Sequence, residues 1–237
     1  MKKRLIWLAP IVIVLAIIAG CAYYVLDAYE VTDKAKALNG NETVIIKETE
    51  WGYFYDGPGQ ENALIFYPGG KVEDLAYSNL LTDISTCGVD CFLVHMPCNF
   101  AFLGIDKADD IISEYSYESW YLAGHSLGGA MAAEYAKKHS NSLTGLIFLA
   151  AYSVQDLSDT DLKVLSLYGR NDGVLDREKL EISRGYMPKN FKEICIDGGN
   201  HAQFGSYGKQ KGDLDATITE EEQQSQTVNA VLDYIYH

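Results

Sequence analysis

The amino-acid sequence predicts an α/β fold with a mostly parallel central sheet and helices on both of its faces. Short apolar runs alternate with stretches of helical periodicity, and this alternation repeats from residue 63 to the C-terminus. Repeated β–α units of this kind form parallel sheets that are covered on both faces. The chain has 237 residues, 48% of them hydrophobic, which is enough for one domain with a full core.

The sheet is expected to begin with an antiparallel hairpin over residues 43–48 and 52–56, because only a short polar connection separates the two segments. Further strands are predicted at 63–67, 89–95, 120–123, 146–149, 163–168 and 191–196. Helices are predicted at 72–86, 108–115, 127–138, 177–186 and 220–236. The last helix carries one apolar face, made by Val228, Val231, Leu232 and Ile235.

The N-terminal segment differs in kind from the rest of the chain. Three basic residues (Lys2, Lys3 and Arg4) precede an uncharged run over residues 5–26. About 20 apolar residues span a bilayer, and basic residues before such a run stay in the cytoplasm. We therefore predict a membrane anchor over residues 1–26, a polar linker over 27–42 and one folded domain over 43–237, held outside the cytoplasm.

Two anchoring chemistries fit this segment. Ile18-Ala19-Gly20-Cys21 resembles a bacterial lipobox, in which the cysteine is lipidated after cleavage. The apolar run continues beyond it to Leu26, however, and Tyr23 and Tyr24 suit the interfacial end of an uncleaved helix. An uncleaved signal anchor is preferred over lipidation at Cys21, and both over cleavage and secretion. The first two alternatives keep the domain at the cell membrane.

Charge and cysteine usage exclude some function classes. The formal net charge of −14 argues against a nucleic-acid partner, which requires a basic surface. No set of Cys and His residues has the spacing of a zinc site, so no metal is expected. Cys91 and Cys195 lie in apolar strand patterns and are expected to be small buried side chains. Disulfides among these two, Cys87 and Cys98 are left open.

A serine lies in the pattern G-x-S-x-G between a predicted strand and a predicted helix, as Gly124-His125-Ser126-Leu127-Gly128. This context is typical of a nucleophile elbow, a tight turn that exposes the serine hydroxyl. The glycines permit the close turn, and the start of the following helix offers the N–H of Leu127 to an oxyanion. Ser126 is therefore the candidate nucleophile.

A serine hydroxyl needs a base to take its proton, and His201 is the candidate. It follows the last predicted strand, in Gly198-Gly199-Asn200-His201, at the sheet edge where ligands bind in open α/β folds. The remaining histidines lie in the elbow itself, before the serine, at a helix end or at the C-terminus (His125, His95, His139 and His237).

Asp172 is the candidate acid. It follows the strand 163–168, in Gly169-Arg170-Asn171-Asp172-Gly173, where its carboxylate would hold the imidazole in the required tautomer. Asp176 is the rival, but it is better suited to cap the helix predicted from Arg177. The order Ser126, Asp172, His201 is the one that nucleophile-elbow hydrolases use.

The loop Pro68-Gly69-Gly70-Lys71 is expected to supply the second oxyanion donor. Gly70 is preferred because glycine lets a main-chain N–H approach a substrate closely, and Lys71 is the alternative. Further substrate contacts are predicted from residues that closely follow a strand or the candidate base, and these are Lys71, Tyr152, Gln203 and Phe204.

The loops at 67–71, 124–128, 169–173 and 197–201 together resemble the α/β-hydrolase superfamily, and within it the small dienelactone-hydrolase-like bacterial branch. The resemblance covers about residues 43–237, and implies hydrolysis of acyl esters or related bonds without a metal or organic cofactor. Superfamily members often carry a lid after the strand that follows the elbow helix. Only residues 151–162 are available there, so neither a helical lid nor activity on long-chain lipids is expected.

The sequence thus predicts a membrane-anchored serine hydrolase, preferably a carboxylesterase that works through an acyl-enzyme. An acyltransferase on cell-envelope material and a peptidase share this chemistry and are alternatives. A non-catalytic binding protein with the same fold is the alternative from another class.

Overall fold

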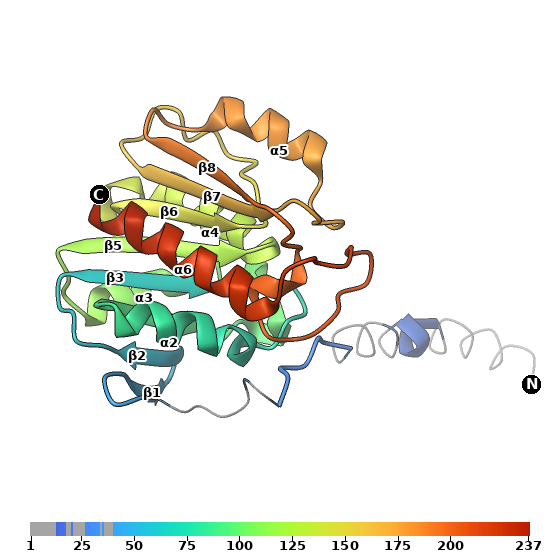
Figure 1. The fold of residues 1–237 in the computed structure, drawn as a ribbon, viewed down its shortest axis with the longest axis horizontal. Helices are drawn as coiled ribbons and strands as arrows, with labels where there is room; N and C mark the ends of the chain where they lie inside the picture. Colours follow the sequence, from blue (N-terminus) through green and yellow to red (C-terminus); the bar gives the residue numbers. More distant parts are fainter. Residues whose placement is uncertain (1–12, 18–19, 21–26, 34, 36–39) are drawn as a thin grey trace, which may run out of the picture.

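A computed structural model describes residues 13–17, 20, 27–33, 35 and 40–237 (Figure 1). Eight strands form one sheet in the order β1-β2-β4-β3-β5-β6-β7-β8. β1 and β2 are antiparallel, as are β2 and β4, and all other neighbours are parallel. The strands are β1 (Ile45–Thr49), β2 (Gly52–Asp56), β3 (Asn62–Tyr67), β4 (Val89–Val94), β5 (Ser119–His125), β6 (Gly145–Leu149), β7 (Lys163–Gly169) and β8 (Phe191–Ile196). The predicted α/β fold is confirmed.

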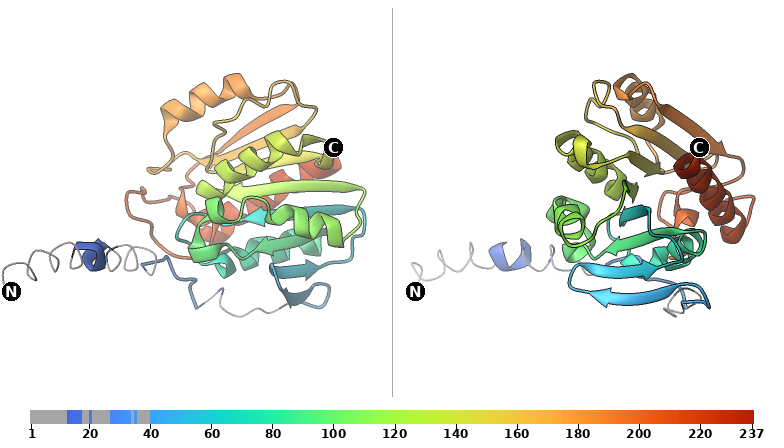
Figure 2. Two further views of the ribbon diagram at one scale, coloured as in Figure 1. Left: turned by 180° about the vertical axis from the view of Figure 1, so that it is seen from behind. Right: turned by 90° about the vertical axis from the view of Figure 1, so that its left-hand side faces the viewer.

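Helices cover both faces of the sheet (Figure 2). α2 (Ser78–Thr86) and α6 (Glu220–Tyr236) pack on one face, where Leu80 and Val231 join the core. α3 (Lys107–Glu114) and α4 (Leu127–Lys138) pack on the other, where Ile111 and Ala133 do so. α5 (Arg177–Ser183) lies beside the β8 end of the sheet (Figure 1). The central strands are therefore buried on both sides, which is why β4 is apolar over nearly its whole length.

Two helices differ from the predicted ranges by more than one residue at an end. The segment predicted as one helix over 72–86 begins with a 3₁₀ turn, Asp74–Tyr77, and becomes α-helical only at Ser78. Its first residues are engaged elsewhere, because Val72 forms a β-bridge with Tyr29. The helix predicted to Tyr186 ends at Ser183 and continues as a 3₁₀ turn through Gly185, a residue type that destabilises helix interiors.

The predicted linker is in part packed against the domain. Within its described residues, the Tyr29 N–H donates to Lys71 O at 2.6 Å and the Thr32 N–H donates to Ser206 O at 2.8 Å. Val31 and Ala35 are buried in the core beside α2 and α6. These residues therefore do not stand off as a solvated stalk. The polar composition of this segment did not predict the packing, which combines main-chain hydrogen bonds with a few apolar side chains.

The predicted anchor lies mostly outside the described residues. No helix among the described residues is long and apolar enough to cross a membrane. Residues 150–162, which join β6 to β7, contain no helix, so the expected absence of a lid after β6 is confirmed. Cys91 is buried and Cys195 is partly buried, and both are free thiols, as are the exposed Cys87 and Cys98.

Candidate active site

The turn between β5 and α4 holds Ser126 in a strained conformation. Its φ of 51° and ψ of −121° are rare for a residue with a side chain. The surrounding glycines make this possible, because a Cβ on Gly124 would lie 2.5 Å from Gly128 C, and one on Gly128 would lie 2.1 Å from Tyr67 O. The Ser126 N–H donates to Leu149 O at 2.9 Å and holds the turn in place. The turn has the geometry that the G-x-S-x-G pattern predicts.

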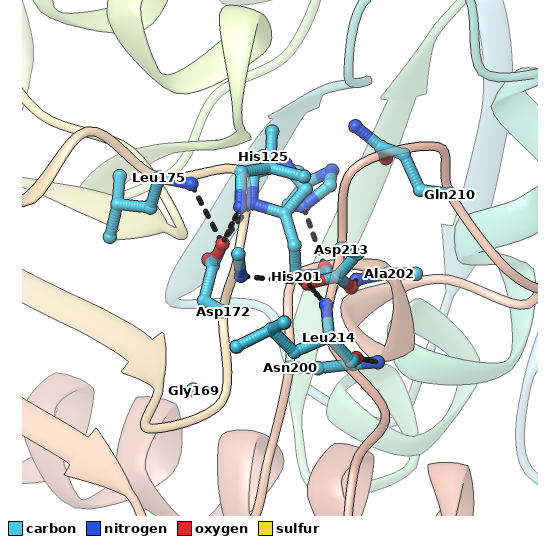
Figure 3. A network of polar contacts seen from close by, with 12 residues as sticks. His125, Gly169, Asp172, Leu175, Asn200, His201, Ala202, Gln210, Asp213 and Leu214 are labelled. Atoms are coloured by element: carbon cyan, nitrogen blue, oxygen red, sulfur yellow. Dashed lines mark hydrogen bonds and ion pairs between the residues drawn. The ribbon is translucent and has the colours of Figure 1, made fainter.

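Asp172 and His201 form a buried pair. His201 Nδ1 lies 2.9 Å from Asp172 Oδ2, and the two side chains are almost fully enclosed. The other carboxylate oxygen accepts the N–H groups of Val174 and Leu175 at 2.9 and 2.7 Å (Figure 3). Because an ionised carboxylate can only accept, Nδ1 carries the proton and Nε2 is left as the acceptor. The rival Asp176 instead caps α5, where its carboxylate accepts the Lys179 N–H.

Ser126 and His201 line the same cavity, which has a volume of about 350 Å³. His201 Nε2 is buried and has no hydrogen-bond partner in the described part of the chain, so Ser126 and His201 are neighbours without a hydrogen bond between them. Hydrogen bonds at a catalytic centre are often long in the absence of substrate and shorten only when it binds. The geometry therefore brings the three predicted side chains together and joins two of them directly.

The cavity is mainly apolar, and one of the four residues predicted to contact substrate lines it. Tyr152 lines it, together with apolar side chains from α4 and from the loops after β6 and β7, among them Leu127, Ala130, Met131, Val154 and Leu175.

The other three predicted contacts lie elsewhere. Phe204 is fully buried in the core, with its ring centre 5.8 Å from that of His125. Gln203 lines a separate cavity of about 570 Å³ and donates its side-chain amide to Ile218 O at 3.3 Å. Lys71 directs its ammonium to Asp27 at 3.1 Å. A position close to His201 in the sequence did not predict where the Gln203 and Phe204 side chains point, because the chain turns toward the core after His201.

The two predicted oxyanion donors are adjacent. A Cβ on Gly70 would lie 2.9 Å from Leu127 Cδ2, so only glycine lets the loop approach the elbow this closely. Leu127 is the first residue of α4, where a backbone N–H has no partner within the helix. The Lys71 N–H is already engaged with Asn99 O at 2.8 Å, which favours Gly70 over Lys71.

A buried hydrogen-bonded chain beside the pair was not anticipated. His125 Nε2 lies 3.1 Å from His201 O, and His125 Nδ1 lies 2.8 Å from the hydroxyl of Tyr77. That hydroxyl accepts the Gly69 N–H at 3.1 Å. Burial, with a smaller contribution from His201, holds the pKa of His125 well below its usual value, so its ring is neutral. The neutral ring donates from Nε2 to the carbonyl and accepts at Nδ1 from Tyr77.

Asp213 joins the loops that carry the pair. One of its carboxylate oxygens accepts the Gly173 N–H, and the other accepts the Ala202 N–H, both at 2.9 Å (Figure 3). Gly173 follows Asp172 and Ala202 follows His201, so a single side chain holds both loops. No motif in the sequence identified Asp213, because it lies in an irregular polar loop.

A possible metal-ligand group lies on the surface away from this cavity. Its members are Asp106, Asp109 and His139, whose ligand atoms lie within 4.8 Å of one another. Asp109 also accepts a hydrogen bond from the hydroxyl of Tyr135 at 2.6 Å. Since none of these residues lines the cavity of Ser126 and His201, the group is separate from the candidate active site.

Comparisons with known proteins agree with this architecture. The model of a family described as "Alpha/beta hydrolase family" matches residues 63–225. No curated protein matches the chain. A predicted CIB-like hydrolase from Thermoplasma acidophilum is similar in structure, with a TM-score of 0.62 at 13% identity, covering 80% of this chain and 99% of that one.

Two further solved structures are similar. Est1E from Butyrivibrio proteoclasticus has a TM-score of 0.59 at 14% identity and covers 83% of this chain and 100% of that one. TT1662 from Thermus thermophilus has a TM-score of 0.56 at 12% identity and covers 82% of this chain and 99% of that one. Likeness at such low identity establishes the fold alone.

Proposed function

This chain belongs to the alpha/beta hydrolase family, and we propose that it is a serine hydrolase that cleaves small acyl esters. Ser126 is the proposed nucleophile, His201 the base and Asp172 the acid. The observation that carries the proposal is the buried 2.9 Å contact between Asp172 and His201, at a cavity that the strained Ser126 also lines. A structural ion pair would not need a free imidazole Nε2 at the cavity.

In the proposed mechanism, His201 Nε2 removes the proton from Ser126 Oγ as the oxygen attacks the ester carbonyl carbon. The carbonyl oxygen becomes negatively charged and is stabilised by the N–H groups of Leu127 and Gly70. The bond to the leaving alcohol then breaks, and the alcohol takes the proton from His201. Water repeats the sequence on the acyl-enzyme, releasing the acid and regenerating Ser126.

Asp172 stabilises the imidazolium that forms during each half of the reaction. Val174 and Leu175 hold one of its oxygens, and this directs the other at His201 Nδ1. A carboxylate that already accepts two hydrogen bonds from main-chain N–H groups is pre-oriented and needs no reorganisation during the reaction.

The acyl group of the proposed substrate is short. The cavity volume of about 350 Å³ lies near the lower end of the range for small-molecule pockets, about 300–1,000 Å³. Asp176 lines the cavity as well, but the wall from α4 and the β6–β7 loop is apolar and suits a hydrocarbon chain.

We further propose that residues 1–26 hold the enzyme at the cell membrane with its domain outside the cytoplasm. The uncharged run over residues 5–26 and the basic residues before it support this orientation. A single-pass helix is preferred, and a lipid on Cys21 is the alternative. Intact mass of the membrane-extracted protein distinguishes them, because lipidation removes the residues before Cys21 and adds acyl chains.

Labelling with a fluorophosphonate probe and turnover of p-nitrophenyl acetate test the proposed chemistry. Ser126→Ala is expected to abolish labelling and to lower kcat by at least about 10⁴-fold. Asp172→Asn is expected to lower kcat by about 10³- to 10⁴-fold, because the amide would favour the wrong imidazole tautomer. Asp176→Asn tests the rival carboxylate, which lines the same cavity but caps α5 and pairs with Lys179 instead of His201, and this variant is expected to retain kcat. Retained activity in Ser126→Ala would disprove the assignment.

A further inference from the structure

The described residues that follow the predicted anchor run along the edge of the sheet at which the candidate active site lies. We call residues 27–33 the N-terminal strap. Tyr29 forms a β-bridge with Val72, and its N–H donates to Lys71 O at 2.6 Å. Lys71 directly follows Gly70, the proposed oxyanion donor. The strap is thus hydrogen-bonded to the loop that supplies this donor.

The strap also contacts the chain that follows His201. The Thr32 N–H donates to Ser206 O at 2.8 Å, and the Lys211 N–H donates to the hydroxyl of Tyr29 at 3.2 Å. The rings of Tyr29 and Tyr207 pack with their centres 5.7 Å apart. The loop after β8 and the loop after β3 lie at the same end of the parallel strands (Figure 1).

These contacts limit the distance between the candidate active site and the end of the proposed anchor. Asp27 is the first residue after the predicted anchor, and its carboxylate pairs with Lys71 Nζ at 3.1 Å. An extended chain rises about 3.4 Å per residue, so Tyr29 lies within about 7 Å of Asp27. With a lipid on Cys21 the tether would lengthen by about 20 Å at most.

Exposed apolar side chains occur in two segments of the chain, one hydrogen-bonded to Lys71 and the other to Tyr29. Phe102 and Leu103 are 50% and 53% exposed, in a loop whose Asn99 O accepts the Lys71 N–H. Leu214 is 58% exposed, in the loop that also carries Lys211. We call Phe102, Leu103 and Leu214 the apolar rim. The net charge of −14 would not draw this domain to an anionic bilayer, so contact there would depend on the tether and on apolar side chains.

We propose that the candidate active site faces the bilayer with the apolar rim in its interface, and that the substrate is a short acyl ester of a membrane-resident amphiphile. This inference rests on the proposed function and anchor. The cavity of about 350 Å³ holds the short acyl group, and the larger alcohol stays in the membrane. Water supplies hydroxide to the acyl carbon and a proton to the departing alcohol, so the products are a short carboxylic acid and the membrane-bound alcohol.

The test uses the full-length protein in phosphatidylcholine vesicles that contain 1-palmitoyl-2-acetylglycerol, with acetate release as the readout. The same vesicles are assayed with soluble p-nitrophenyl acetate, and outward-facing enzyme is counted by fluorophosphonate labelling. The double variant Phe102→Ser/Leu103→Ser is expected to hydrolyse the vesicle-borne ester at least about fivefold more slowly and the soluble ester at an unchanged rate.

Ile45→Ser/Ile182→Ser is the matched control, because both side chains are exposed to a similar degree but lie on β1 and α5. It is expected to leave both rates unchanged. An insertion of about 20 Gly and Ser residues between Leu26 and Asp27 would lengthen the tether by on the order of 25 Å. It is expected to slow hydrolysis of the vesicle-borne ester alone.

Three outcomes would overturn the inference. If the wild type hydrolyses the soluble ester but not the vesicle-borne one, the proposed function stands and the membrane-facing substrate does not. The same conclusion follows if the rim variant and the insertion variant both match the wild type on vesicles. If the wild type hydrolyses neither ester and Ser126 is not labelled, the proposed function itself fails, and this inference fails with it.

Discussion

The imidazole Nδ1 of His125 lies 2.8 Å from the hydroxyl oxygen of Tyr77, and both side chains are fully buried. Through this contact the main chain at His201 is linked to the main chain at Gly69. The proposed base and the proposed oxyanion donor Gly70 are thus held by one hydrogen-bonded chain. His125 and Tyr77 are positioning residues, since neither lines the cavity of Ser126.

Tyr77→Phe is expected to lower kcat for p-nitrophenyl acetate roughly tenfold with little change in KM. The variant leaves the Gly69 N–H and His125 Nδ1 without a partner, which costs about 1–3 kcal/mol for a buried group. The loop that carries Gly70 would then be less well placed for the oxyanion. Tyr55→Phe is the matched control, because it removes a buried hydroxyl that bonds Ser78 and contacts neither Gly69 nor His125 in the described structure. An equal loss of stability in both variants without a loss of kcat in Tyr77→Phe would contradict this role.

Stability is expected to fall as the pH drops below about 6.5, in part because His125 is buried in its neutral form. Burial lowers the pKa of His125 in the folded state, so the unfolded chain binds a proton there that the folded chain does not. The contribution of His125 is therefore complete above its unfolded pKa and is lost as the pH falls toward its folded pKa. Each pH unit in this window costs up to about 1.4 kcal/mol.

Urea unfolding at several pH values between about 5 and 7.5 measures this effect. His125→Asn is expected to reduce the dependence on pH, because asparagine does not titrate there. An unchanged pH dependence in the variant would show that His125 is not the group responsible. His139→Asn serves as a control, since the His139 ring is only partly enclosed and packs on Tyr135.

Asp213→Asn is expected to lower kcat by roughly tenfold and to destabilise the fold by about 1–3 kcal/mol. The amide retains one oxygen and so cannot hold both Gly173 and Ala202. The loops of Asp172 and His201 would lose their common support. Asp215→Asn is the matched control two residues further along, where the carboxylate forms an exposed ion pair with Lys209. Thermal unfolding and steady-state kinetics measure both effects, and equal behaviour of the two variants would refute this role.

Gly128→Ala is expected to destabilise the protein by more than about 3 kcal/mol or to prevent folding. The added Cβ would lie 2.1 Å from Tyr67 O and 2.4 Å from Pro68 O, which are both main-chain atoms. Gly185→Ala is the control, because nothing lies within 4 Å of its added Cβ. Soluble yield and thermal unfolding are the readouts. A Gly128→Ala protein as stable as the control would show that β3 and α4 can separate at little cost.

Much of the fold could be predicted from local patterns. The helices 127–138 and 220–236 were predicted with the bounds that the structure has, and the six later strands lie at or within a few residues of their predicted positions. These elements have strong signals: alternation of apolar runs with helical stretches, glycines at the elbow, and a capping box at Thr219 and Glu222 that begins α6. The predicted start of the helix at residue 72 was wrong, because Val72 instead pairs with the distant residue Tyr29.

The sequence by itself determined the fold class, the strained serine turn and the choice of Asp172 and His201 as partners, because each depends on local spacing and on the end of the sheet at which a loop lies. Only the tertiary structure decided that Phe204 and Gln203 point away from the cavity, that Asp213 and His125 support the site, and that residues 27–33 run beside it. Those contacts join residues far apart in the chain, often through main-chain atoms that every residue shares. Local sequence spacing therefore does not predict these contacts, and only the packed structure brings the groups together.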